Sequence, residues 1–329
     1  MKIYLKYVAL AAACALCFLS GCGRENGTGT LMDSLGEPIQ MGESGEIRGA
    51  EGDGTGLGEF GGSVNTGVEK PNGPGDTAAL LDGTGMTLET RVKTPSGYER
   101  IAAEEGSFAR YLRSFPVKEM GAKVHLYDGS EKADQSGHAS VFDLPIENYD
   151  LQQCADTVMR VYAEYFWSSG QVDRIAFHFT NGFLAEYTKW RDGMRIRVSG
   201  NDVSWVSSGE YDDSYDCFVQ YLRMVFCYAG TLSMSGESRD ITMEELEVGD
   251  VFLHGGSPGH VVMVMDVCEN AEGKKAFLLG QGYMPAQEFH LLKNGLHEED
   301  PWYYEEELEY PLRTPGYTFQ EGSLKRLLY

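Results

Sequence analysis

The chain has 329 residues, with 50 Asp and Glu against 27 Lys and Arg, so its formal net charge is −23. This charge argues against nucleic acid as a partner, because affinity for phosphate backbones comes mainly from clustered Lys and Arg. It also argues against electrostatic docking on anionic lipid. Apolar residues make up 42% of the chain and aromatic residues 12%, which is enough for a packed core and excludes global disorder.

Residues 1–22 have the features of a secretory signal. Lys2 and Lys6 precede an apolar stretch from Val8 to Leu19, which ends in Leu19-Ser20-Gly21-Cys22. That tetrapeptide resembles the bacterial lipobox, whose Cys becomes the lipidated first residue of the mature protein. A transmembrane helix is the alternative, but the apolar run is shorter than the roughly 20 residues a span needs. We therefore expect an extracytoplasmic protein anchored to the cell membrane through lipid on Cys22.

Residues 23–86 contain 18 Gly, a single aromatic residue (Phe60) and a net charge of −8. Such a segment cannot bury enough apolar surface to offset its chain entropy, and this predicts a disordered tether. Residues 56–61 match the dinucleotide fingerprint G-x-G-x-x-G. Since no strand precedes the match and no helix follows it, we interpret it as a coincidence of low complexity.

Residues 87–329 hold 34 aromatic residues and a net charge of −17, and no Pro/Gly/Ser-rich break interrupts them. This predicts one globular domain. Apolar side chains recur at helical spacing from Asp150 to Ser169 and from Ser214 to Ala229, where Gly230 ends the second helix.

Short apolar runs predict strands around and after these helices. They cover residues 122–127, 139–144, 174–180, 194–199, 203–207, 250–254, 260–267, 275–280 and 288–292. Residues 270–273 are expected to form a hairpin turn. Helices followed by strands favour an α+β fold over alternating βαβ units.

The strongest set of candidate catalytic residues lies in the second half of the chain. Cys217 falls in the first turn of the second predicted helix, after an N-cap at Asp213 or Ser214, where the helix dipole favours a thiolate. His260 heads a buried strand, a suitable place for a rigid general base. Gln281 follows the next strand and could orient the imidazole ring.

This order resembles the NlpC/P60 branch of the papain-like cysteine peptidases, in which a D-C at a helix start precedes a G-D strand and a G-H-V strand. The matching residues are Asp216-Cys217, Gly249-Asp250 and Gly259-His260-Val261. Phe218-Val219 stand where that family has Ser-Gly. The resemblance implies a papain-like core over residues 211–292, with Cys217, His260 and Gln281 as catalytic residues and no cofactor.

Structural roles explain the same residues without catalysis. Cys217 lies on a stripe with Tyr221, Met224 and Tyr228 that is typical of the buried face of a helix. His260 could be a hydrogen-bonded histidine at the end of a strand. The domain would then be a non-catalytic module that binds peptide or glycan in the same cleft.

Over its whole folded length the chain also resembles a bacterial domain family of unknown function, family 4846. Six blocks carry this resemblance: residues 94–98, 107–113, 150–156, 228–231, 256–260 and 281–287. The resemblance implies no established activity.

Three other candidate sites have weaker support. Residues 255–259 fit G-x-S-x-G, but a strand follows where the nucleophile elbow needs a helix. His254, His260, His290 and His297 could gather a metal, but they lack metal-site spacing, and we expect no metal. An acidic aromatic run, residues 298–307, would suit a sugar or a cationic peptide, or would form a solvated loop with its aromatics turned inward.

Cys154, Cys217, Cys227 and Cys268 could pair as disulfides in three ways, and the sequence does not choose among them. The sequence thus predicts a lipid-anchored envelope protein that hydrolyses an amide bond of cell-wall peptide. The alternative is the binding module.

Overall fold

The computed structural model describes residues 80–329. The expected signal, the lipidation site Cys22 and most of the expected tether lie outside these residues. Residues 80–86, which the composition assigns to the tether, belong to the folded part. Leu81 forms a β-bridge with Val92, and the carbonyl of Gly85 accepts hydrogen bonds from the buried guanidinium of Arg91.

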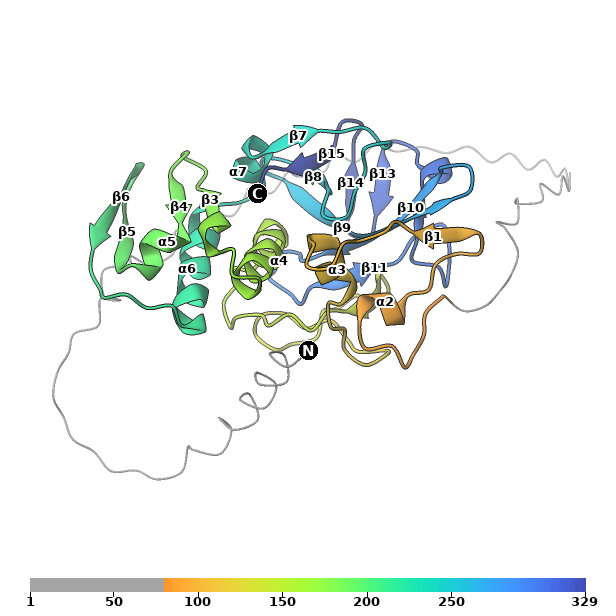
Figure 1. The fold of residues 1–329 in the computed structure, drawn as a ribbon, viewed down its shortest axis with the longest axis horizontal. Helices are drawn as coiled ribbons and strands as arrows, with labels where there is room; N and C mark the ends of the chain where they lie inside the picture. Colours follow the sequence, from red (N-terminus) through yellow and green to blue (C-terminus); the bar gives the residue numbers. More distant parts are fainter. Residues whose placement is uncertain (1–79) are drawn as a thin grey trace, which may run out of the picture. The chain divides into compact units, whose positions relative to one another are not determined.

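Within residues 80–329, a nine-stranded sheet forms the centre of the fold (Figure 1). Its main path is β2-β11-β10-β9-β8-β15-β7, and β1 and β12 pair with β9 and β10 off this path. The strands are β1 (Tyr98–Arg100), β2 (His138–Val141), β7 (Ser238–Asp240), β8 (Val251–His254), β9 (His260–Asn270), β10 (Lys275–Gln281), β11 (His290–Leu292), β12 (Tyr303–Tyr304) and β15 (Leu324–Leu327).

The long hairpin β9–β10 is the core of this sheet. Nearly every residue of both strands is buried, because their apolar runs are covered on both faces by two hydrophobic clusters. The turn after Asn270 closes at Gly273, whose φ of 79° favours glycine. This is the hairpin that the sequence predicts.

Helix α4 (Cys154–Ser168) packs against β9 and β10, and α3 (Phe108–Arg113) also packs against β9. Helix α6 (Tyr215–Tyr228) packs instead against α4 and α5 (Tyr187–Arg191). The remaining α-helices in the described residues are α2 (Leu88–Arg91) and α7 (Thr231–Gly236). Figure 1 shows α4 beside the sheet and α6 farther out, among α5, β5 and β6.

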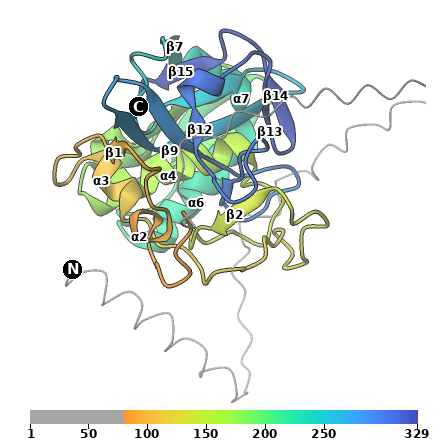
Figure 2. The same ribbon diagram turned by 90° about the vertical axis from the view of Figure 1, so that its right-hand side faces the viewer.

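Three two-stranded sheets complete the described fold. They are β3 (Ala176–His178) with β4 (Leu184–Glu186), β5 (Met194–Ser199) with β6 (Asp202–Ser207), and β13 (Leu312–Thr314) with β14 (Tyr317–Phe319). Strand β14 of the β13–β14 hairpin packs against β8, and Figure 2 shows β13 and β14 side by side.

Two ion pairs connect β1 and α3, which come early in the described chain, to β9. Asp266, on β9 and fully buried, accepts Nε of Arg100 at 2.6 Å and Nε of Arg113 at 2.7 Å. A buried carboxylate is tolerated only when it is paired in this way. The segment that holds β1 and α3 is therefore an integral layer of the domain.

The predicted α+β class is confirmed, since helices pack on antiparallel sheets. Both predicted helices form, and the N-cap of the second is Ser214. The expected strand at 122–127 is wrong, because only isolated bridges form there, from His125 and Leu126. In the described part of the chain, no helix has both the length and the apolar character to cross a membrane.

Candidate functional site

His260 begins β9 and is 3% exposed. Its ring centroid lies 4.9 Å from the rings of both Tyr283 and Tyr317 and 5.9 Å from the ring of Phe319. Burial lowers the pKa of His260 to about 4, and its hydrogen bond to Gln281 raises it by less. The imidazole is therefore neutral at pH 7, the form that a general base requires.

The amide of Gln281 has one possible orientation. Its Nε2 donates to the carbonyl oxygen of Pro315 at 3.2 Å, and a carbonyl can only accept. Its Oε1 consequently faces Nε2 of His260 at 2.8 Å. His260 Nε2 must carry the proton in this bond, which leaves Nδ1 as the basic nitrogen.

His290 extends the same hydrogen-bond chain. Its Nδ1 donates to the carbonyl oxygen of Glu288 at 2.8 Å, so its unprotonated Nε2 accepts from Nε2 of Gln281 at 3.3 Å. Burial lowers the pKa of His290 to about 4 and keeps it in this neutral form. In the sequence, His290 stands out only as a candidate metal ligand, and its part in orienting Gln281 is visible only in the structure.

The structure places Cys217 away from His260. Cys217 lies in the first turn of α6 and is 1% exposed. It is not part of the hydrogen-bond chain formed by His260, Gln281 and His290. Burial raises the pKa of its thiol, and the charged or polar groups that affect it are Asp212, Arg195 and Trp190. Helix α6 adjoins α5 and β5 in Figure 1, whereas His260 begins β9 of the nine-stranded sheet. Cys217 thus occupies the buried stripe of its helix.

A different cysteine lies next to His260. Cys154 is the first residue of α4, after the N-cap Gln153, and its side chain is partly exposed. The backbone of Val261, the residue that follows His260, lies close enough to the Cys154 thiol to lower its pKa slightly, against the larger effect of burial. The packing of α4 against β9 therefore brings a helix-start thiol to the strand-start imidazole.

Two aromatic side chains contact His260 and also lie close to Cys154. Tyr283 and Tyr317 each touch the His260 ring, and the charge of a Cys154 thiolate would raise the pKa of both tyrosines. The two rings thus form a common wall beside the thiol and the imidazole.

The end of β10 approaches the first turn of α4. Gly282 follows Gln281, and a Cβ atom at Gly282 would lie 3.0 Å from the carbonyl oxygen of Gln153 and 2.9 Å from Cβ of Thr157. Only glycine allows this approach. Cys154, His260 and Gln281 therefore converge from one helix and two adjacent strands.

Burial sets the protonation of the cysteine as well. Desolvation, followed by the charge of Asp156, raises the pKa of Cys154 to about 11, and hydrogen bonds from the backbone of Ala155 and Val261 oppose this. Thiol and imidazole are both neutral at pH 7. Among the described residues no hydrogen bond joins them directly, and the side-chain partner of His260 is Gln281.

A cavity of about 640 Å³ adjoins the Gln281 side of this cluster. Gln281, Tyr283, His290, Pro315 and Gly316 form its inner side. The outer side consists of residues from two loops, Lys132, Asp134, Ser136, Gly137, Lys293, Asn294, Gly295, Leu296, His297 and Glu298. Its volume suits a ligand of a few residues.

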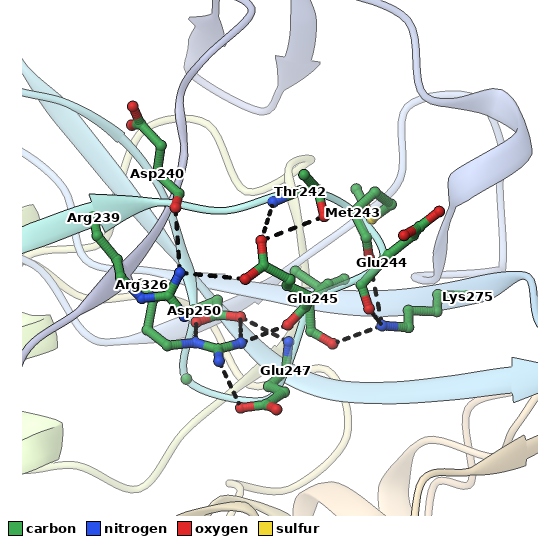
Figure 3. A network of polar contacts seen from close by, with 12 residues as sticks. Arg239, Asp240, Thr242, Met243, Glu244, Glu245, Glu247, Asp250, Lys275 and Arg326 are labelled. Atoms are coloured by element: carbon green, nitrogen blue, oxygen red, sulfur yellow. Dashed lines mark hydrogen bonds and ion pairs between the residues drawn. The ribbon is translucent and has the colours of Figure 1, made fainter.

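The Gly249-Asp250 pair has a structural role. The Asp250 carboxylate binds the guanidinium of Arg326 on β15 through two contacts of 2.8 Å, and Glu247 lies 3.1 Å from the same guanidinium (Figure 3). Nearby, the ammonium of Lys275 donates to the carbonyl oxygens of Glu244 and Leu246. These contacts hold the loop before β8 and do not reach His260.

The weaker candidate sites do not assemble. The G-x-S-x-G match at 255–259 is the loop between β8 and β9, so no helix follows Ser257. Within residues 80–329 no group of three His, Cys, Asp or Glu side chains could hold a metal ion. Cys154, Cys217, Cys227 and Cys268 are all free thiols.

The acidic aromatic run is folded inward. Trp302 is fully buried and donates its Nε1–H to the carbonyl oxygen of Lys93 at 2.9 Å. Tyr303 is also buried, and Glu305 binds Lys274. These aromatic rings are core, not an exposed sugar-binding surface.

Sequence reasoning missed Cys154 for an identifiable reason. The predicted helix began at Asp150, which placed Cys154 inside the helix and not at its start. The one available signal was the block 150–156, which carries part of the family resemblance and contains Cys154.

No curated protein and no solved structure matches the chain. The model of one family, described as "Domain of unknown function (4846)", matches residues 88–326. This match covers most of the chain and nearly all of the described fold. The chain therefore belongs to the family of proteins that carry the domain of unknown function 4846.

Proposed function

We propose that the protein is a cysteine-type amide hydrolase of the cell envelope that acts on cell-wall peptide, with Cys154 as its nucleophile. The observation that carries this proposal is the convergence of Cys154, His260 and Gln281. The hydrogen bond to Gln281 leaves Nδ1 of His260 unprotonated beside a helix-start thiol. A thiol, a base and a group that orients the base are the parts that acyl transfer needs.

The reaction begins when the Cys154 thiol turns to Nδ1 of His260. His260 takes the proton as the sulfur attacks the carbonyl carbon, and backbone N–H groups in the first turn of α4 stabilise the oxyanion. The C–N bond then breaks, and the amine leaves with the proton from His260. Water attacks the thioester with His260 again as base, which releases the acid and restores the thiol.

The test is hydrolysis of cell-wall peptide by the full-length protein, measured as the release of new amino groups. Cys154→Ala should lower the rate by at least about a thousandfold, and His260→Ala by about a hundredfold or more. Cys217→Ala is the matched control and should retain activity. Activity that survives in Cys154→Ala and disappears in Cys217→Ala would overturn the assignment of Cys154.

A non-catalytic module that binds peptide or glycan in this cleft is the second candidate function. It is favoured by the protonation of the pair, since a thiol with a pKa of about 11 is a weak nucleophile at pH 7. Labelling with iodoacetamide distinguishes the two functions. A catalytic Cys154 should react faster in the wild type than in His260→Ala, whereas a thiol without a general base should react equally slowly in both.

We further infer that lipid on Cys22 holds this domain at the extracytoplasmic face of the cell membrane. The support is in the sequence, where Lys2 and Lys6, an apolar run and Leu19-Ser20-Gly21-Cys22 stand in the order of a lipoprotein signal. Acyl chains on one residue supply enough buried methylene groups for stable anchoring. The domain would then act on substrate in the envelope.

A further inference from the structure

We infer that the 640 Å³ cavity beside Gln281 is a subsite for a carboxylate group of the ligand, with the ammonium groups of Lys132 and Lys293 as its recognition elements. The inference rests on the proposed function in that the cavity would hold the part of a peptide next to the bond at Cys154. It assigns the ligand to the class of peptides that carry a free carboxylate near this bond.

The two lysines carry charges that the described protein leaves without carboxylate partners. In residues 80–329, neither Lys132 nor Lys293 forms an ion pair, and the Lys293 ammonium has no hydrogen-bond partner. Lys132 donates only to the backbone carbonyl of Asp134. The domain carries a strongly negative net charge, and most of its described lysines pair with carboxylates. Two ammonium groups without an ion pair in one cavity are an exception to this pattern.

The charges of these two lysines act on the histidines at the cavity. After the larger effect of burial, both Lys132 and Lys293 lower the pKa of His138, whose ring contacts that of His290. Lys132 also lowers the pKa of His290, which lines the cavity. The two lysines therefore make the potential more positive on the side of the cavity that His290 lines.

Two acidic residues, Asp134 and Glu298, also line the cavity. The Asp134 carboxylate accepts from the backbone N–H and the hydroxyl of Ser136, at 2.8 Å and 2.6 Å. Hydrogen bonds from Ser136 and, to a lesser extent, the charge of Lys132 lower the pKa of Asp134, so this carboxylate is ionised. Both carboxylates are exposed, and solvent therefore screens their charges more than those of the half-buried lysines. His297, the remaining titratable side chain of the wall, pairs with Glu307.

The position of the cavity connects it to the proposed reaction. Tyr283 has its ring against His260 and its hydroxyl bonded to the carbonyl oxygen of Gly316 at 2.7 Å, and it lines the cavity. Gln281 and His290, which set the tautomer of His260, line it too. A peptide that extends past Tyr283 would thus place its next residue between the lysines.

The experiment measures binding and not turnover. Full-length Cys154→Ala protein is titrated calorimetrically with two probes, N-acetyl-trialanine with a free C-terminal carboxylate and the same peptide with a carboxamide. A charge-assisted hydrogen bond to lysine should make the carboxylate probe bind at least about tenfold more tightly. Lys293→Gln should reduce this preference, and Lys132→Gln with Lys293→Gln should abolish it.

Two controls make the result specific. Lys293→Arg should keep the preference, and Lys123→Gln, which removes an exposed lysine outside the cavity, should leave it unchanged. Equal affinities for the two probes, no binding of either, or a preference that survives in the double variant would each overturn the subsite. Since binding is read in Cys154→Ala, a lysine-dependent preference supports the subsite even where the wild type hydrolyses nothing.

Discussion

At the scale of single residues, the hydrogen-bond chain from Glu288 to His260 depends on a neutral His290. A proton on His290 Nε2 would face the amide N–H of Gln281 and remove an acceptor. Gln281 would then lose the contact that helps to keep its Oε1 toward His260. Burial prevents this at neutral pH by holding the pKa of His290 at about 4, and it holds the pKa of His260 at about 4 as well.

These two histidines should make the folded state sensitive to acid. An unfolded histidine titrates near pH 6.5, so between pH 6.5 and 4 the unfolded chain binds protons that the folded protein refuses. The free energy of unfolding should fall over this window, by on the order of 3 kcal/mol per histidine at pH 4. Denaturant unfolding at a series of pH values measures this loss.

Variants assign the acid sensitivity to particular side chains. His290→Gln keeps a polar side chain and removes one titration, so the loss of stability between pH 6.5 and 4 should shrink by about half. His254→Gln is the control, because His254 is exposed on the same sheet. An unchanged slope in His290→Gln would contradict the assignment.

Cys154 and Cys217 illustrate what could not be predicted from the sequence at this scale, namely which of the two lies near His260. Both begin a helix, and the Asp216-Cys217 pair has the closer motif. Which helix faces His260 depends on the packing of α4 against β9 across more than 100 residues, which no local pattern encodes. His260 and Gln281, by contrast, lie on neighbouring strands of one sequential hairpin, and the sequence was sufficient to bring them together.

At the scale of elements, the contact between the start of α4 and the end of β10 sets the geometry of the candidate site. The absence of a side chain at Gly282 lets the strand approach Gln153 and Thr157 closely. A displacement of this turn would move Cys154 away from the wall that Tyr283 forms. The contact therefore links packing directly to reactivity.

Gly282→Ala should separate the two elements. The new Cβ would lie 2.9 Å from Cβ of Thr157 and closer still to its hydroxyl, and relief of such overpacking costs about 1–3 kcal/mol. We expect a lower melting temperature and a loss of hydrolysis larger than the loss of folded protein explains. Circular dichroism and the hydrolysis assay on the same sample measure both.

Gly236→Ala is the matched control, since Gly236 ends α7 and a Cβ there meets nothing within 4 Å. It should leave stability and activity unchanged. A Gly282→Ala protein with wild-type stability and activity would show that α4 and β10 are not held as closely as the structure has them.

The elements differ in how far the sequence predicts them. Helices α4 and α6 and strands β5, β6, β8, β9 and β10 have long apolar patterns, and all of them form near their expected positions. The elements that were missed are short: strands such as β1, β7 and β12 have two or three residues, and helices such as α3 and α7 have six. Such short strands exist only because a neighbouring strand offers backbone partners, so their own residues carry no detectable period.

At the scale of the whole chain, the proposed lipid anchor makes location depend on one residue. Replacement of Cys22 by Ala removes the thiol that would carry the acyl chains. The expected result is a shift of the protein from the membrane pellet to the soluble extracytoplasmic fraction. Fractionation followed by immunoblotting measures it, and Cys227→Ala, which removes an exposed cysteine of the domain, is the control.

Membrane association that persists in Cys22→Ala would contradict the lipid anchor. An apolar segment that stays in the membrane as a helix would give that result, and this is the alternative to cleavage at the lipobox.

The position of β9 late in the chain also determines when, during synthesis, the domain can fold. Arg100 and Asp266, which pair across β1 and β9, are separated by 166 residues, so a ribosome releases the first strand long before its partner exists. Strands β1 and β2 must wait for their partners β9 and β11 through most of synthesis, and contacts of such long range are slow to form. A fragment limited to residues 211–292 would lack α4, α3 and β1. Folding and assembly of the Cys154 site should therefore be a single event that comes only after the last strands have left the ribosome.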